Sequence, residues 1–330
     1  MEPLSREEVL TCVEAAVRAP SIHNTQPWLF LHEDDRIEVH ADPSRRLPSV
    51  DPQGRALHLS LGAAVLNLCL GVAAAGRRPF LDLLPAAGDE RHVATVTAEG
   101  PYAMDDEDRA LYEAIPVRRT SRRPFLDAPV DPQALRRLEE AALLQGGELK
   151  FADEPERELL LSLVRTADER RKDDFAYRAE LRTWTTDDPY REDGVPLEAM
   201  GPGSRDGAVP VRVFTPELER DVREFESEPV IAVLSAVGGD SPADWLRAGQ
   251  ALQRVLLEAT RLGLATGLFT QPMEHADLRD LLADPAGRTH VQAILRFGHA
   301  AEGTSLTARR SAEDVIARGR PLPLRPTRLG

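Results

Sequence analysis

Five polar side chains stand together in a short stretch between two prolines, and their types suit the binding of a ligand. They are Ser21, His23, Asn24, Thr25 and Gln26, between Pro20 and Pro27. Because proline rings fix both ends of the stretch, we expect a defined loop lined with hydrogen-bond donors and acceptors. Such a loop could grip a flat polar ligand. The alternative is a plain helix-to-strand connection whose side chains bond only to the local backbone.

A second candidate site is a run of basic residues in an otherwise acidic chain. Residues 118–123 contain Arg118, Arg119, Arg122 and Arg123, with Ser121 among them, although the formal net charge of the chain is −14. Guanidinium groups bind phosphate through two parallel hydrogen bonds, so the cluster predicts an anion site. The alternative is a solvated basic turn that offsets nearby acids.

The hydrophobic pattern predicts the elements around these two stretches. We expect a helix over 5–19, with Ser5 and Glu8 as a capping box, and then a hairpin. A strongly apolar helix over 54–75 should be central and buried. The remaining predicted helices cover 132–144, 155–181 and 244–262, and the predicted strands cover 28–31, 37–39, 80–84, 93–97, 229–236, 268–269 and 291–297. Residues 184–209 lose periodicity, which is typical of a functional or disordered loop.

The two halves of the chain repeat one pattern. Gly62-x-Ala64-Val65 aligns with Gly249-x-Ala251-Leu252 without a gap, and the helix 4–19 matches 130–145. Two unrelated amphipathic helices could align in this way, but the shared order of elements favours duplication and fusion. The polar loop belongs to the first half and the arginine cluster to the second, so the halves could together form one site.

Composition narrows the class of protein. Hydrophobic residues make up 42% and charged residues 29% of the 330-residue chain, as in globular proteins. The acidic balance argues against binding of nucleic acid or of anionic membranes. We expect no membrane-spanning run and no signal peptide, and therefore a cytoplasmic location. Cys12 and Cys69 are expected to be buried thiols, with no disulfide framework and no metal site.

Both candidate stretches resemble motifs of the nitroreductase superfamily, and in particular its internally duplicated Acg-like branch. The loop matches Ala-Pro-Ser-x-x-Asn-x-Gln-Pro-Trp at residues 19–28, and the basic cluster matches Arg-x-Ser-x-Arg-x-Phe at 119–125. The resemblance implies an α+β nitroreductase-like fold of two fused halves, each a mainly antiparallel sheet flanked by helices. It implies the divisions 1–101, 102–317 and a C-terminal extension, 318–330.

The resemblance also implies one bound FMN and a set of residues that hold it. The implied ring contacts are Ser21 and Asn24, with Gln26. The implied phosphate contacts are Arg119, Ser121 and Arg123, while Arg122 is expected to be solvated. Thr270 and Gln271 fall beside the reactive edge of the ring, where many relatives have glycines or an acidic residue. Arg309 and Arg310 are candidates for a C-terminal basic contact.

The implied activity is an FMN-dependent oxidoreductase that takes electrons from NAD(P)H and passes them to a nitro compound, a quinone or a similar acceptor. No side-chain acid or base is required. The loop 184–209 would be a lid that packs through Trp184, Tyr190 and Met200. The alternative is a lidded protein that holds or sequesters FMN with little or no nitroreductase activity. A fused pseudo-dimer should be a monomer with one FMN site.

Overall fold

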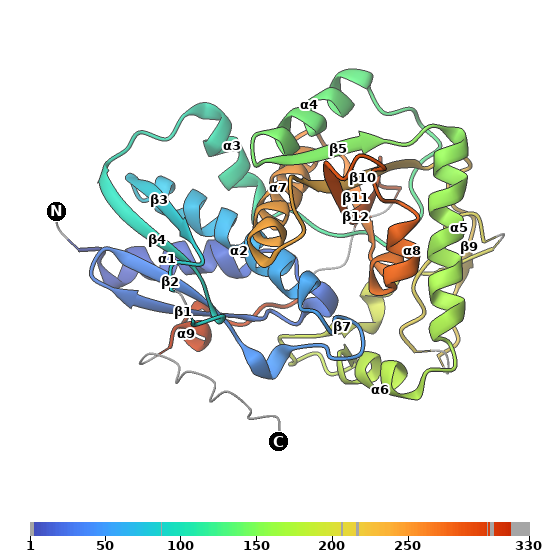
Figure 1. The fold of residues 1–330 in the computed structure, drawn as a ribbon, viewed down its shortest axis with the longest axis horizontal. Coiled ribbons are helices and arrows are strands. Elements are labelled where there is room, and N and C mark those ends of the chain that lie inside the picture. The colour runs from blue at the N-terminus through green and yellow to red at the C-terminus, as the bar shows by residue number, and fades with distance from the viewer. Residues whose placement is uncertain are drawn as a thin grey trace.

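Two helices of 20 residues each, α2 (Arg55–Ala74) and α7 (Pro242–Arg261), lie side by side at the centre of the molecule (Figure 1). The computed structural model describes residues 3–86, 88–205, 207–215, 218–301, 303 and 307–317. The predicted extension 318–330 lies outside the described residues. Almost every residue of α2 is buried, which explains why its sequence is apolar on all sides.

The first half builds a four-stranded antiparallel sheet beside α2. Helix α1 (Arg6–Val17) begins at the predicted Ser5–Glu8 capping box. The strand order is β1-β2-β4-β3, and α1 and α2 pack against the sheet through one hydrophobic core. The strands are β1 (Trp28–Glu33), β2 (Arg36–Ala41), β3 (Arg77–Leu83) and β4 (His92–Pro101), followed by α3 (Asp106–Ala114).

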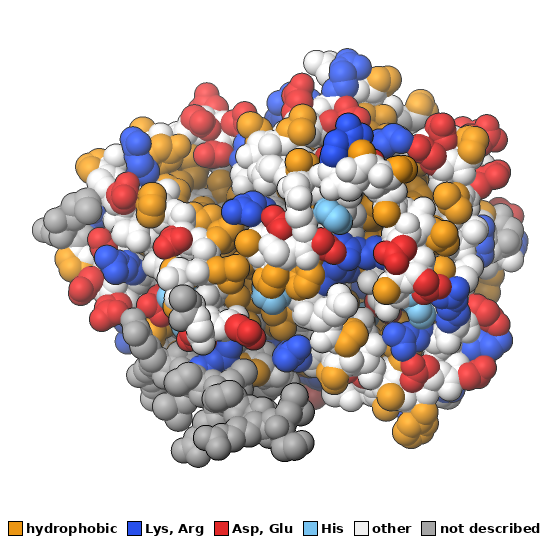
Figure 2. Space-filling view, in the orientation of Figure 1, with side chains coloured by type: hydrophobic (Ala, Val, Ile, Leu, Met, Phe, Trp, Pro, Cys, Tyr) orange, Lys and Arg blue, Asp and Glu red, His pale blue; other side chains and the backbone are white. Residues whose placement is uncertain are grey.

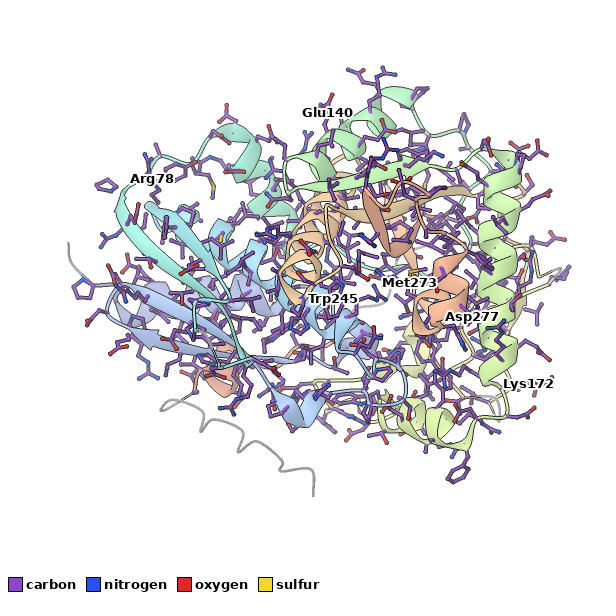
Figure 3. All side chains as sticks on the ribbon, in the orientation of Figure 1. Arg78, Glu140, Lys172, Trp245, Met273 and Asp277 are labelled. Atoms are coloured by element: carbon purple, nitrogen blue, oxygen red, sulfur yellow. The ribbon has the colours of Figure 1, made fainter. Side chains whose placement is uncertain are left out.

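The second half builds a second four-stranded sheet, with α4 (Pro132–Leu143) and α7 on one face. Residues of α5 (Glu154–Arg171) and Met273 form a separate core with the sheet's other side chains. Figure 3 shows Met273 beside α8 (Ala276–Asp280) and Trp245 at the start of α7. The strands are β5 (Gly147–Phe151), β10 (Val230–Val237), β11 (Ala265–Phe269) and β12 (Thr289–Gly298).

The two sheets have the same topology. The second sheet runs β5-β10-β12-β11, which matches β1-β2-β4-β3 strand for strand in chain order. All the pairings in both sheets are antiparallel. The expected α+β architecture of two similar halves is therefore confirmed.

The central helices meet at two glycines that the sequence repeat aligned. A Cβ atom on Gly62 would lie 2.1 Å from the Leu246 carbonyl oxygen, and one on Gly249 would lie 2.2 Å from the Leu59 carbonyl oxygen. Each glycine thus faces the residue three positions before the other. This reciprocal contact is that of a pseudo-two-fold axis, and it requires glycine at both positions because the backbones approach so closely.

The long insertion between α5 and β10 differs from its prediction. The helix expected over 155–181 is broken at 172–174, where Asp174 caps a new helix, α6 (Phe175–Thr183). The segment that follows contains two short parallel pairs, not an open loop. These pairs join β6 (Thr185–Thr186) to β7 (Val195–Pro196) and β8 (Gly203–Ser204) to β9 (Val222–Arg223).

Acidic and basic side chains are interspersed over the face shown in Figure 2, where no large patch has one sign.

We expected no membrane-spanning run, but α2 is long and apolar enough to qualify by length and composition alone. Its apolar window is 89% buried inside the protein, so it is a core helix.

Candidate functional site

The polar loop adopts an unusual backbone. His23, Asn24 and Gln26 have φ values of 49°, 55° and 50°, in the left-handed region that non-glycine residues rarely occupy. The Ser21 hydroxyl accepts a hydrogen bond from the Gln26 amide, and the Ser60 hydroxyl on α2 accepts one from the Ile22 amide. Such strain persists where surrounding contacts fix the backbone, and it is concentrated at functional sites.

Asn24 and Gln26 use their side chains to hold two neighbouring segments. The Asn24 amide nitrogen donates to the carbonyl oxygens of Gly194 and Ala308. The Gln26 side chain donates to the Glu192 carbonyl and accepts from the Arg310 amide. The loop therefore joins the insertion at 192–194 to the C-terminal segment at 308–310.

We predict that Gln26→Ala loosens both segments. The Gln26 side chain is fully buried, and its removal takes away the hydrogen bonds to the part-buried Glu192 carbonyl and from the part-buried Arg310 amide, at a cost of about 0.5–1.5 kcal/mol each. Hydrogen exchange should accelerate at residues 192–194 and 308–310 in the variant. Gln133→Ala, at an exposed position on α4, is the control and should change neither segment. Unchanged exchange in Gln26→Ala would contradict this role.

A cavity beside the loop is lined by four arginines and no acidic residue. This arginine pocket has a volume of about 470 Å³, including space open to solvent. Its polar walls are formed by Ser21, Asn24, Arg118, Arg119, Thr120, Arg122, Thr307 and Arg309. None of the four guanidinium groups forms a salt bridge with a carboxylate of the described residues.

The positive charges of the arginine pocket are buried and repel one another. Burial, together with the charges of Arg309 and Arg119, lowers the pKa of Arg118 to about 9. Burial, with Arg119 and Arg18, lowers the pKa of Arg309 to about 10. The Nε atoms of Arg118 and Arg309 are buried without a hydrogen-bond partner among the described residues. Buried like charges without a counter-ion are costly, so the pocket is suited to an anion.

A larger cavity adjoins the arginine pocket. The two share Pro20, Ser21, Thr120 and Arg122 on their walls, and the larger one has a volume of about 1060 Å³, including space open to solvent. Its floor includes the start of α2 and the strand β11. Its other polar walls include His23, Arg55, Ser60, Ser121, Arg212, Thr270, Gln271, Gln292 and Arg296.

The larger cavity contains a neutral histidine and a fixed arginine. Burial lowers the pKa of His23 well below its usual value, and the nearby charges of Arg212 and Arg122 add to this effect. Arg212 is held by Glu274, and it donates to the Thr270 hydroxyl at 2.9 Å. These partners hold the Arg212 guanidinium at the cavity wall while they neutralise its charge.

The sequence-predicted residues divide between the cavity walls and other places. Ser21 lines both cavities; Ser121, Thr270 and Gln271 line the larger one; Asn24, Arg119 and Arg309 line the arginine pocket. Gln26, Arg123 and Arg310 line neither. Arg123 lies instead in a separate groove with Arg205 and Arg223, because consecutive side chains of the cluster point in different directions.

Sequence reasoning missed several residues of the cavity walls, and four of them are instructive. Arg118 is buried, and Arg122, expected to be solvated, lines both cavities and donates to the Ala199 carbonyl. Arg212 and Phe214 come from the long insertion, which has no motif. Arg118 and Arg122 could have been found in the basic run itself, but the sequence does not show which of its side chains point inward.

The three expected lid anchors do not reach either cavity. Trp184 is flanked by the guanidinium groups of Arg45 and Arg191, each 5.8 Å from the ring centroid. Met200 is 1% exposed in its own core cluster, whereas Tyr190 is 91% exposed, so the expectation that Tyr190 packs is wrong.

A later stretch of the insertion lines the larger cavity. Residues 209–212 and Phe214 line it, and the Phe214 ring meets His23 edge-on at 5.6 Å between centroids. The Arg122 guanidinium lies 5.1 Å from the centroid of the same ring. The insertion therefore contributes to the cavity wall mainly through residues from 209 onward.

Comparison with known proteins places this site in a family. No family model matches the chain. It is 34% identical over 319 residues to the Mycobacterium tuberculosis protein named "Putative NAD(P)H nitroreductase Rv3131", covering 94% of this chain and 91% of that one. It is 29% identical to "Putative NAD(P)H nitroreductase acg" of the same organism, covering 95% and 96%. The chain belongs to the nitroreductase superfamily, in its Acg-like branch.

Solved structures give more distant matches. A nitroreductase with bound FMN from Desulfitobacterium hafniense has 15% identity and a TM-score of 0.40, covering 66% of this chain and all of that one. An FMN- and NADPH-dependent nitroreductase, NfnB, from a Sphigopyxis strain has 20% identity and a TM-score of 0.40, covering 64% of this chain and 99% of that one.

Proposed function

We propose that the protein is an FMN-dependent NAD(P)H oxidoreductase of the nitroreductase type. The observation that carries the proposal is the arginine pocket, which has four guanidinium groups and no acid and adjoins a larger cavity. A phosphate in the pocket would compensate the buried positive charge, and an attached ring system would extend into the larger cavity. The names of the relatives, putative NAD(P)H nitroreductases, agree with this assignment.

The residues present fit FMN, since several buried polar atoms have no partner among the described residues. These atoms are Arg118 Nε, Arg309 Nε, Asn24 Oδ1 and His23 Nε2. Arg118, Arg119, Arg122 and Arg309 would hold the phosphate, and Ser21 would lie at the junction with the ring. When bound, FMN would supply the hydride and electron transfer between the nicotinamide and a nitro compound, quinone or similar acceptor.

The side chains of the larger cavity would then position and polarise the ring. Thr270 and Gln271 offer a hydroxyl and an amide at the wall, and Arg55 offers positive charge for a reduced, electron-rich ring. His23 is neutral, so the proposed mechanism requires no proton transfer from it. Residues 209–212 and Phe214 would keep water from the ring.

A second candidate function is the holding of FMN beneath a closed cover. The observation that favours it is Phe214, which is 3% exposed and lies against His23 and Arg122 at the cavity wall. If this ring stays in place, it limits the space available to a nicotinamide above the flavin.

The visible spectrum of the purified protein separates these functions. Under anaerobic conditions, we expect a flavin band that bleaches with NADPH or NADH and returns with air or a nitroaromatic compound. A band that dithionite bleaches but nicotinamides do not would favour FMN holding. A colourless protein that cannot be reconstituted with FMN would overturn both functions.

We also propose the setting in which this activity operates. The protein would act in the cytoplasm on small molecules, without nucleic acid or membrane partners. The division into residues 1–101, which supply the ring loop, and 102–317, which supply the phosphate site, remains our proposal. Because the two halves already pack as a pseudo-dimer through α2 and α7, we propose a monomer, which sedimentation velocity would test.

A further inference from the structure

Two histidines and a glutamate meet on the first sheet, away from both cavities. His40 and Glu38 lie on β2, and His92 begins β4. One candidate ligand atom from each residue lies within 4.8 Å of the other two. None of the three lines the arginine pocket or the larger cavity, so the proposed FMN site does not use them.

The register of the strands produces this cluster. A bulge between Val39 and His40 shifts the pairing of β2 with β4, so that His40 stands directly opposite His92. The two imidazole rings are stacked, with centroids 4.6 Å apart and an angle of 16° between planes. Glu38 and His40 are two residues apart on one strand and therefore project from the same face. A β-bulge changes the direction of the side chains beside it, and here it lies next to His40.

The Glu38 carboxylate faces the Nε2 atoms of both rings. Glu38 Oε2 is 2.8 Å from His40 Nε2 and 4.0 Å from His92 Nε2. The side chains are mostly buried, with exposed fractions of 4% for His40, 9% for Glu38 and 11% for His92. Because these three polar side chains are largely removed from water, their polar atoms need partners other than solvent.

The chemistry of the three groups favours a cation. Two neutral imidazoles supply only one N–H donor each, whereas together with a carboxylate they supply several acceptor lone pairs. Nitrogen and oxygen lone pairs that converge on one point are what a metal ion requires. Two imidazoles and one carboxylate are a ligand set for Zn²⁺, with further positions left for water.

We propose that Glu38, His40 and His92 form a binding site for a divalent transition-metal ion, with Zn²⁺ as the best-suited ion. The site would tie β2 to β4 at the bulge, and it is independent of the proposed oxidoreductase function. His92 Nε2 also lies 2.9 Å from the Thr95 hydroxyl. Binding would exchange that hydrogen bond for a metal bond.

The test is calorimetric titration of Zn²⁺ into the untagged, chelator-treated protein with its flavin content unchanged. We expect one Zn²⁺ per chain and a melting temperature that rises with Zn²⁺ concentration, as mass action requires. His92→Gln and Glu38→Gln should both lose the binding. His32→Gln is the matched control, because His32 lies on the neighbouring strand β1, outside the cluster, and it should bind as the wild type does.

Two results would contradict the proposed metal site. Wild-type protein that takes up no Zn²⁺ would overturn the proposal, even if a variant fails to fold. Uptake that persists in a folded His92→Gln or Glu38→Gln variant, as judged by circular dichroism, would overturn it too. Because flavin absorbance is followed in the same samples, failure of the metal site and failure of the FMN site are distinguishable.

Discussion

Replacing Arg118 by methionine should change the affinity for FMN and the stability of the apoprotein in opposite directions. The variant removes a buried guanidinium that the proposed phosphate requires, and a charge-assisted hydrogen bond contributes about 1.5–3 kcal/mol, so FMN should bind about 10- to 100-fold more weakly. Without FMN, the same guanidinium is a buried charge among like charges, whose burial lowers its pKa to about 9. The apoprotein should therefore become more stable by about 1–3 kcal/mol.

The measurements are fluorescence titration of the apoprotein with FMN and chemical denaturation with and without the cofactor. Arg123→Met is the matched control: it belongs to the same motif, but its side chain lies in a separate groove. It should leave FMN affinity within about twofold of the wild type, since surface substitutions change free energies by about 0.5 kcal/mol or less. If Arg118→Met destabilises the apoprotein and binds FMN normally, the pocket is not an anion site.

The second large effect is expected where α2 and α7 cross. Alanine normally stabilises a helix relative to glycine by about 1 kcal/mol, so an ordinary helical glycine would tolerate Gly249→Ala well. Here the new Cβ would lie 2.2 Å from the Leu59 carbonyl oxygen, which is backbone and cannot rotate away. The helices must separate, and we expect a loss of stability of about 3 kcal/mol or more.

Chemical denaturation of the apoprotein measures this loss. Gly100→Ala on β4 is the control, because no atom lies within 4 Å of a Cβ placed there. Gly62→Ala should cost as much as Gly249→Ala, since the two contacts are reciprocal. Equal stability of Gly249→Ala and Gly100→Ala would show that the helices can move apart at little cost, contrary to the close packing described here.

The site lies at the junction of the two halves, so neither half alone contains all the residues of the cavity walls. The strained loop at 20–27 comes from the first half, whereas the arginines and β11 come from the second. The second half has Gln145-Gly146-Gly147 where the first has its polar loop, so the motif occurs once in the chain. We therefore propose a single cofactor site in the duplicated fold.

Interactions between residues that are close in the sequence determined much of what could be predicted. The capping box at Ser5, the hairpin β1–β2 and the apolar helix α2 depend on neighbouring residues, and each was confirmed near its expected ends. The repeat also predicted two similar sheets, because the order of elements along a chain largely sets the topology of a small antiparallel sheet.

Only the tertiary structure decided which polar side chains meet. Asn24 and Gln26 belong to the signature, but long-range carbonyls at Glu192, Gly194 and Ala308 engage their amides. Arg122 points into the cavities while Arg123 points away, and Phe214 closes a cavity from a segment without any motif. The sequence shows which polar side chains a stretch contains. The direction of each side chain depends on partners far away in the sequence, and no local pattern encodes them.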